Sequence, residues 1–87
     1  MNYHLILKPS AQKQLENLAD VMQRRIVQKI EQIETEPRMS GSVKLAGGRN
    51  TYRVRVGDYR IVYEVDDPAR TVIVTIIAHR REVYRGL

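Results

Sequence analysis

Cysteine is absent from the 87 residues, which excludes disulfides and thiolate metal sites. No apolar run approaches the ~18 residues that a membrane-spanning helix needs. The first residues also lack the basic-then-apolar pattern of a secretory signal. These absences predict a protein of the cytoplasm that has no association with a membrane.

The chain is short, and its length predicts a single domain that spans residues 1–87. Its apolar fraction of 43% is ordinary for a globular protein. A core of this size supports an independent fold only marginally, so a partner chain would contribute to stability.

Positive charge is unevenly distributed along the chain, whose formal net charge is +5. Residues 1–43 carry six Lys or Arg against five Asp or Glu. Residues 44–87 carry nine against five, and eight of those nine are Arg. The planar guanidinium of arginine donates two parallel hydrogen bonds to a phosphate or a carboxylate. The second half therefore indicates nucleic acid or an acidic protein as the partner.

The first third of the chain predicts one strand followed by helix. Tyr3–Leu7 is extended and ends before Pro9, because the residue before a proline disfavours helical geometry. Either Ser10 is the N-cap of the following helix, or Pro9 lies in its first turn. Apolar residues then recur at steps of three and four, as on one stripe of a helix: Leu15, Leu18, Met22, Ile26, Ile30 and Ile33.

A pattern similar to a capping box divides this helical stretch. Asp20 followed by Gln23 predicts a new helix with Asp20 as its N-cap. We therefore expect a first helix over about Ser10–Leu18 and a second over about Val21–Glu36, with one continuous helix as the alternative. Polar residues off the apolar stripe predict a solvated helix face, with contact of the Arg24-Arg25 pair to RNA as the alternative: Arg24, Arg25, Gln28, Lys29, Gln32 and Glu34.

The stretch Asn50–Ile61 predicts a β-hairpin. Its first half alternates apolar residues with arginine, which is the pattern of a strand with two different faces. Gly57-Asp58 is a connection of the kind that closes a two-residue turn. Arg55 then lies opposite Arg60, and like charges in such a pair cost about 0.2–1 kcal/mol. Either the arginines together hold an anion, or they spread apart in water.

The second half is expected to form three strands: Thr51–Val56, Tyr59–Val65 and Thr71–His79. If Val65 pairs with Thr71, Arg60 lies opposite Ile76. One side of the sheet then carries these residues: Arg53, Arg55, Arg60, Arg80, Val72, Val74 and Ile76. The other side faces the helices and includes His79. A slip of one residue would exchange the two sides of the last strand.

The element order β-α-α-β-β-β predicts an α+β fold of two layers, in which both helices pack on one face of an antiparallel sheet. The last strand is expected to be central. Its apolar residues would form the floor of a concave basic cleft with the arginines around the rim. The residues after this strand include a usable acid–base set, with a frayed basic terminus as the alternative: His79, Arg80, Arg81 and Tyr84.

Three segments closely resemble the RelE branch of the RelE/ParE superfamily, the toxins of bacterial type II toxin–antitoxin pairs: Lys44–Gly47, Tyr52–Val65 and Ile77–Tyr84. The central Gly57–Arg60 motif is shared across the superfamily, and the His79–Tyr84 ending is similar to that of its ribonuclease branch. The resemblance covers nearly the whole chain and includes the order of the elements.

This resemblance implies a RelE-like fold and cleavage of messenger RNA in the decoding site of the ribosome. The 2′-hydroxyl would attack the adjacent phosphate and leave a 2′,3′-cyclic phosphate and a 5′-hydroxyl. No metal or cofactor is expected, because preorganised cations stabilise such a transition state. The catalytic positions implied are Arg60, Arg80, Tyr84 and His79. The positions expected to bind RNA or phosphate are Arg53, Arg55, Lys44 and Arg81.

One departure from the family concerns the strand arginines. Members often carry a lysine where this chain has Arg53 or Arg55. A lysine whose pKa is lowered can lose its proton, whereas arginine stays protonated in proteins. Proton transfer would then pass to His79 or Tyr84, and the sequence leaves both open.

The resemblance also implies a cognate, RelB-like antitoxin, through which alone the pair binds operator DNA. The antitoxin would cover the cleft, pull Tyr84 away from it, or do both. Two other functions stay open. A ParE-like toxin would inhibit DNA gyrase without cleaving RNA. A non-cleaving protein would dock on the ribosome and only block translation.

Overall fold

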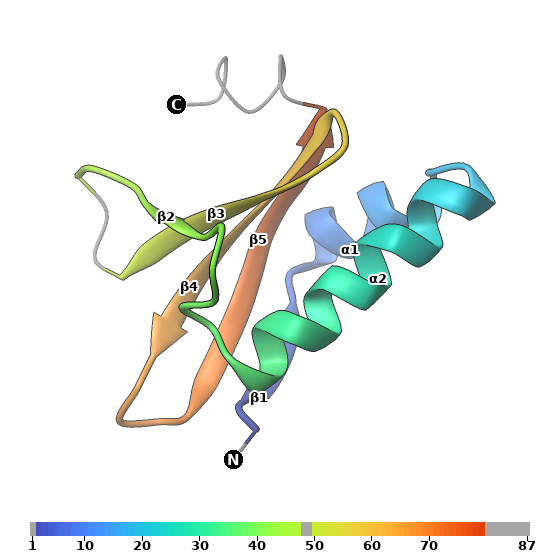
Figure 1. Cartoon of the computed structure of the whole chain (residues 1–87). Coiled ribbons are helices and arrows are strands. Elements are labelled where there is room, and N and C mark those ends of the chain that lie inside the picture. The colour runs from blue at the N-terminus through green and yellow to red at the C-terminus, as the bar shows by residue number, and fades with distance from the viewer. Residues whose placement is uncertain (1, 48–49, 80–87) are drawn as a thin grey trace.

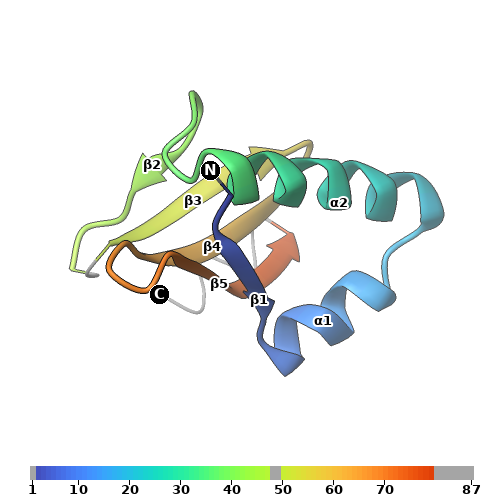
Figure 2. The same ribbon diagram turned by 90° about the horizontal axis from the view of Figure 1, so that it is seen from below.

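A sheet and two helices form two layers in the computed structural model, which describes residues 2–47 and 50–79 (Figure 1). The elements in chain order are β1 (His4–Leu7), α1 (Pro9–Glu16), α2 (Asp20–Thr35), β2 (Val43–Lys44), β3 (Thr51–Val56), β4 (Tyr59–Asp66) and β5 (Thr71–His79). Figures 1 and 2 show both helices on the same side of the sheet. The predicted two-layer α+β fold is therefore confirmed.

The sheet differs from the prediction at both edges. Its strand order is β1-β5-β4-β3-β2, so β5 is central as expected. β1 runs parallel to β5, which makes the sheet mixed instead of antiparallel. Two helices and three strands separate β1 from β5, which is ample chain for the crossover that parallel neighbours require. The two-residue strand β2, which the sequence did not indicate, pairs with β3 at the other edge.

The two helices begin and end within two residues of their predicted bounds. Lys8 is the N-cap of α1 and Pro9 lies in its first turn, so the second of the two alternatives is confirmed. The break between the helices is also present, but the predicted capping box is wrong. Ala19 is the N-cap of α2, and Asp20 is its first residue. Neither α1 nor α2, the helices of the described chain, could cross a membrane.

Gln23, which the capping box assigned to the start of α2, acts on α1 instead. Its side-chain amide donates a hydrogen bond of 3.1 Å to the Leu15 carbonyl. The same carbonyl accepts from the Leu18 backbone N–H at 3.2 Å, so Gln23 adds a second bond at the end of α1. Gln23 thereby ties the end of α1 to the beginning of α2.

The core lies between the helices and the sheet. The most completely buried large side chains are Tyr63, Ile26, Ile33, Ile61, Ile77, Val72 and Val74. The rings of Tyr52 and Tyr63 stack with centroids 5.9 Å apart. Because the apolar stripe of α2 supplies Ile26 and Ile33, the periodicity of the sequence identified the buried face of this helix correctly.

The register between β4 and β5 differs from the prediction. Val65 lies opposite Val72 instead of Thr71. This slip of one residue turns Val72 and Val74 to the helix side, where both are fully buried. The sequence did not specify the register here, because β5 carries apolar residues on both of its faces.

A β-bulge between Val74 and Ile76 extends this slip to two residues in the second half of β5. Beyond the bulge, Arg60 lies opposite Ala78 instead of Ile76. Side chains alternate between the two faces of a strand, so a shift of two residues leaves each side chain on its predicted face. Ile76 therefore lies on the arginine side, as predicted. The bulge therefore decides which β5 residues surround the arginines.

Arg38 and Asp67 join the loop after α2 to the turn between β4 and β5. Two guanidinium nitrogens of Arg38 donate to the two carboxylate oxygens of Asp67, at 3.1 and 2.8 Å. Arg38 Nε also donates to the Tyr52 hydroxyl at 2.8 Å, and the Tyr3 hydroxyl donates to Asp67 at 2.8 Å. The hydrogen bonds from Arg38, and then that from Tyr3, hold the pKa of Asp67 below its ordinary value.

Replacement of Asp67 by Asn should make the melting temperature less dependent on pH in the acidic range. Because the folded pKa of Asp67 is below the unfolded one, its carboxylate contributes stability above about pH 4. That contribution is lost as the pH falls through the folded pKa. We expect Asp67→Asn to melt a few degrees below the wild type at neutral pH, with a difference that shrinks below about pH 4.

Thermal melting followed by circular dichroism across this pH range checks the prediction. Glu31→Gln, which removes an exposed carboxylate from α2, is the matched control. A difference between Asp67→Asn and the wild type that stays constant down to pH 2 would contradict it.

Candidate functional site

The β3–β4 hairpin closes as the sequence predicts. Val56 pairs with Tyr59, and Arg55 lies directly opposite Arg60. Gly57 has a φ of 59°, a conformation that glycine adopts without steric cost. A two-residue hairpin turn of type II′ requires this conformation at its first central residue. The turn thus sets the register that brings the two arginines together.

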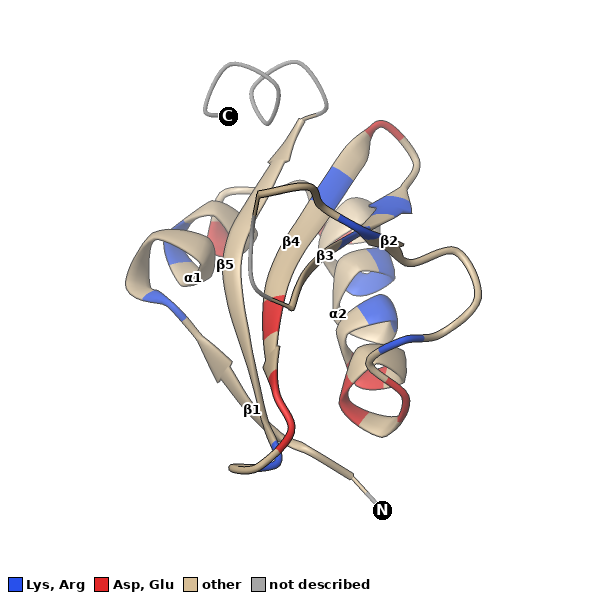
Figure 3. Cartoon of the chain, turned by 90° about the vertical axis from the view of Figure 1, so that its left-hand side faces the viewer, with Lys and Arg blue, Asp and Glu red and all other residues tan. Residues whose placement is uncertain are grey.

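Three arginines lie on the open face, by which we mean the face of the sheet opposite to both helices. Strand alternation places Arg53, Arg55 and Arg60 there, because their neighbours along each strand point into the core. Figure 3 shows this face, with Lys and Arg in blue on the upper parts of β3 and β4. Acidic residues, in red, lie at the lower end of β4 and in the turn after it. The cations therefore gather at one end of the open face.

The two arginines of the cross-strand pair have different environments. Arg60 is only 3% exposed, whereas Arg55 is exposed. A buried guanidinium has little freedom to move, so its donors are already positioned, which is what stabilisation of a transition state requires. A phosphate can reach Arg60 only when the atoms that cover its guanidinium move aside.

A second apolar cluster, separate from the main core, lies beside Arg60 on the open face, where Ala78 is directly opposite Arg60: Val62, Ile76, Ala78 and Leu45. Of the predicted floor residues only Ile76 belongs to it. Val72 and Val74 were assigned to this floor wrongly, because the register slip turns them to the helices. Leu45 anchors the loop after β2 onto this cluster, and not onto the main core.

Two predicted site residues leave the sheet on the helix side. His79 pairs with Tyr59, and the two rings meet edge to face with centroids 5.6 Å apart. Lys44 pairs with Tyr52, whose ring is buried in the main core. Residues directly opposite in an antiparallel pair project to the same side. His79 and Lys44 therefore do not share the open face with Arg60.

The remaining predicted residues, Arg80, Arg81 and Tyr84, lie outside the described residues. The concave rim to which Arg80 was assigned therefore stays a prediction. Within residues 2–47 and 50–79, no cluster of three His, Asp or Glu is placed to hold a metal ion.

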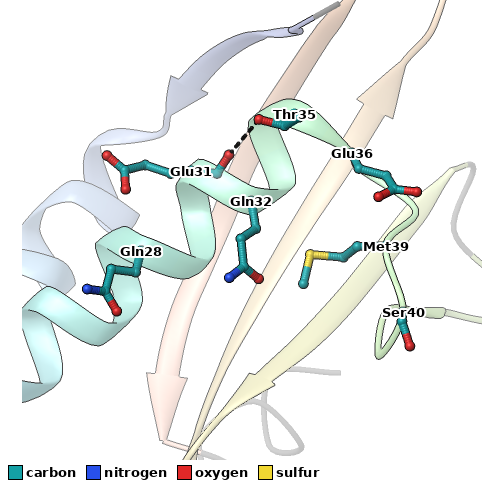
Figure 4. Close-up of a pocket in the computed structure, with 7 residues that line it drawn as sticks. All are labelled: Gln28, Glu31, Gln32, Thr35, Glu36, Met39 and Ser40. Carbon is teal, nitrogen blue, oxygen red and sulfur yellow. Dashed lines mark hydrogen bonds between the residues drawn. The ribbon is translucent and has the colours of Figure 1, made fainter.

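An open groove of about 710 Å³ runs along the second half of α2, beside the loop that follows this helix (Figure 4). Its lining residues are Gln28, Glu31, Gln32, Thr35, Glu36, Met39 and Ser40. Of these described residues, two are acidic and none is basic. The groove is therefore unsuited to phosphate.

A smaller cavity, of about 240 Å³, adjoins this groove and shares two glutamines with it. It lies between α2 and β3 and is lined by Arg25, Gln28, Lys29, Gln32, Arg55, Val56 and Gly57. The sequence favoured a solvated helix face for Arg25 and Lys29, with contact to RNA as the alternative for the Arg24-Arg25 pair. Their helical spacing with the two glutamines indicated one common stripe, but not the strand that this stripe meets.

Comparison with protein families gives one match that covers almost the whole chain. The model described as the ParE toxin of type II toxin–antitoxin system, parDE, matches residues 5–84. Toxin RelG from Mycobacterium tuberculosis is 40% identical over 42 residues, which are 48% of this chain and 45% of the relative. The match thus spans less than half the length of this relative.

Solved structures of toxin–antitoxin complexes share the fold. The toxin of the intact E. coli RelBE complex superposes with a TM-score of 0.80 at 25% identity, over 88% of this chain and 95% of that chain. An archaeal RelE–RelB complex from Pyrococcus horikoshii has a TM-score of 0.79 at 28% identity, over 92% of this chain and 97% of that chain.

Proposed function

This chain belongs to the family of ParE toxins of type II toxin–antitoxin systems, within the RelE branch of the RelE/ParE superfamily, and we propose that it is a ribosome-dependent endoribonuclease that cuts messenger RNA. Three arginines on one helix-free face, around an apolar cluster, support this proposal most directly. Cations arranged in this way can contact successive phosphates of a single strand. The toxin would act in the cytoplasm, where translated messages are found.

The proposed reaction has three requirements. The 2′-hydroxyl must lose its proton as its oxygen attacks the adjacent phosphorus, the charge of the phosphorane must be stabilised, and the leaving 5′-oxygen must gain a proton. Arginine can meet only the second requirement, because it stays protonated. We assign the scissile phosphate to Arg60 and Arg80, and the flanking phosphates to Arg53 and Arg55.

The proton-transfer role is assigned to Tyr84 before His79. His79 projects to the helix side of the sheet, away from Arg60. A tyrosine hydroxyl among cations is more easily ionised than one in water, so Tyr84 can act as an acid or a base. Arg81 and Lys44 remain proposed RNA contacts. From its place on the helix side, Lys44 can reach only RNA that continues around the β2 edge of the sheet.

Ribosomes programmed with a defined message test the proposal. We expect the toxin to produce fragments that end in a 2′,3′-cyclic phosphate and begin with a 5′-hydroxyl. One 2′-deoxynucleotide at a cut site should abolish that cut, because the attacking hydroxyl is missing. Cuts elsewhere in the same message are the internal control. An unchanged cut at the deoxynucleotide, mapped by primer extension, would refute this mechanism.

Inhibition of DNA gyrase is the second candidate, because the matching family model is that of ParE. DNA breaks and filamentous cells after induction, with intact messages, would favour this function. Arrested translation without DNA breaks or cut messages would instead indicate a protein that only blocks the ribosome.

A RelB-like antitoxin is the proposed partner, since the structural relatives include RelE–RelB complexes. The apolar cluster around Arg60 and the arginines beside it suit a partner helix with one apolar and one acidic side. Binding of operator DNA is assigned to the antitoxin.

A further inference from the structure

We propose that the cavity between α2 and β3 is a second phosphate-binding site, which takes a backbone phosphate of the RNA held by this protein. The proposal rests on the proposed function for its RNA ligand. The cavity itself, of about 240 Å³, is separate from the apolar cluster around Arg60.

Two cationic residues of α2 line this cavity. Arg25 and Lys29 lie one turn apart on the helix, and Arg55 of β3, whose side chain projects to the open face, borders the cavity at the edge of the sheet. No acidic residue of the described chain lines the cavity. Like charges one turn apart on a helix repel one another, so a bound anion would relieve the repulsion between Arg25 and Lys29. The amides of Gln28 and Gln32 add neutral donors of the kind that bind phosphate oxygens.

The hairpin turn positions Arg25. Two of its guanidinium nitrogens lie 3.4 and 3.7 Å from the point at which a side chain on Gly57 would begin. Any larger residue at position 57 would therefore contact the guanidinium, whereas glycine leaves it room. A guanidinium that already lies against the backbone has less freedom to lose when it binds a ligand.

Arg55 connects the cavity to the open face. In the described part of the chain, β2 pairs with Tyr52 and Arg53 alone, so β3 forms an edge of the sheet beyond this point. Arg55 lies opposite Arg60 and also lines the cavity. A strand of RNA that leaves Arg60 and passes over this edge would therefore meet the cavity next.

Charge distinguishes an RNA phosphate from an acidic protein segment. The adjoining groove, which shares Gln28 and Gln32 with the cavity, is lined by Glu31 and Glu36 (Figure 4). Figure 3 shows the same division along α2, with blue turns followed by red ones. An acidic peptide that extended along the groove would be repelled by both glutamates, whereas one phosphodiester in the cavity would not reach them.

The variant Arg25→Gln/Lys29→Gln tests the site. Its control is Lys13→Gln/Arg24→Gln, which removes the same two charges from exposed helix positions outside the cavity. The probe is a fluorescent single-stranded 2′-O-methyl RNA, which cannot be cleaved because it lacks the attacking hydroxyl. Its binding is followed by fluorescence anisotropy at a series of salt concentrations.

We expect the cavity variant to bind this RNA at least about tenfold more weakly at low salt. The slope of the logarithm of affinity against the logarithm of salt concentration should fall by about 0.7, because one phosphate contact with a single strand is lost. The control variant should keep the wild-type slope.

Ribosomes without message form a second arm, which identifies the source of the phosphate. A loss confined to the free RNA assigns the site to the message, and a loss confined to ribosomes assigns it to ribosomal RNA. Equal slopes for the two double variants in both arms would overturn the proposal. So would a loss seen only with a peptide rich in Asp and Glu, which would assign the cavity to an acidic protein.

Lys29→Gln alone is the second variant, since it leaves Arg25 against the hairpin turn and so protects the fold. Cleavage of ribosome-bound message, measured in parallel, separates this proposal from the proposed function. If the wild type binds RNA through the cavity but never cuts it, the phosphate site stands and the proposed ribonuclease function is refuted. If the wild type cuts RNA but the variants keep the wild-type salt slope, the function stands and the phosphate site is refuted.

Discussion

Arg60→Met is expected to abolish cleavage of ribosome-bound message while the protein stays folded. Arg60 is the buried member of the arginine pair, at 3% exposure, and it lies on β4 directly opposite Ala78 of the apolar cluster. Loss of one preorganised donor to a developing negative charge reduces turnover by about 10²–10³-fold. Because the scissile phosphate is assigned to this residue, we expect a loss of at least this size.

Methionine is chosen because the site is enclosed and largely apolar. Methionine keeps the length of the side chain without a polar group, so we expect the variant to fold. Thermal melting of the variant beside the wild type is the control for folding.

Two further variants separate the role of Arg60 in catalysis from a general effect of charge on this face. Arg60→Lys keeps the charge but loses the planar fork, so an intermediate rate is expected. Arg53→Met, on the same face, should weaken binding more than turnover. A folded Arg60→Met protein that cuts message at the wild-type rate would remove Arg60 from the active site.

Tyr84→Phe is expected to lower the rate of cleavage by about 10²–10⁴-fold, the range over which a positioned acid or base contributes. His79→Ala should lower it by less than about tenfold, because His79 lies on the helix side against Tyr59. Single-turnover rates on programmed ribosomes, measured across pH, would separate the two. The pH dependence should survive in His79→Ala and be lost in Tyr84→Phe.

The double variant Tyr84→Phe/His79→Ala closes this series. Full activity in the double variant would exclude both residues from proton transfer. The opposite order of effects, with the larger loss in His79→Ala, would assign the role to His79. Melting curves of all three proteins serve as the control for folding, because the ring of His79 contacts that of Tyr59.

A buried arginine opposite a second arginine is an arrangement that stability alone would not favour. Like charges in a directly opposed pair are destabilising, and burial of a guanidinium adds a desolvation penalty. Burial of apolar side chains in the main core offsets the repulsion and the desolvation penalty. Ile61 and Tyr63, on the other side of the same strand, are fully buried there. The β3–β4 hairpin thus combines a stable face with a functional one.

Local sequence patterns were sufficient to predict most of the helices and strands and the pairing within the β3–β4 hairpin. The bounds of β3 and β5, the break between the helices and the pairing of Arg55 with Arg60 depend on neighbours in the chain. Strand alternation and a glycine at the turn act over a few residues, so the sequence contains all the information that they need.

The register of β5 and the parallel position of β1 could not be predicted in this way. β5 is apolar on both faces, and a strand of this kind satisfies either register until the rest of the core is assembled. The bulge before Ile76 then decides which of its residues surround Arg60.

The sequence by itself thus determined the two-layer fold, the hairpin and the arginines that share its open face. Tertiary structure alone decided that Arg60 is buried, that Lys44 lies on the other side, and that Arg25 and Lys29 of α2 line a cavity against β3. The physical reason is range: propensity and alternation act between residues close in the chain. Burial and the convergence of charges arise only where distant segments pack together.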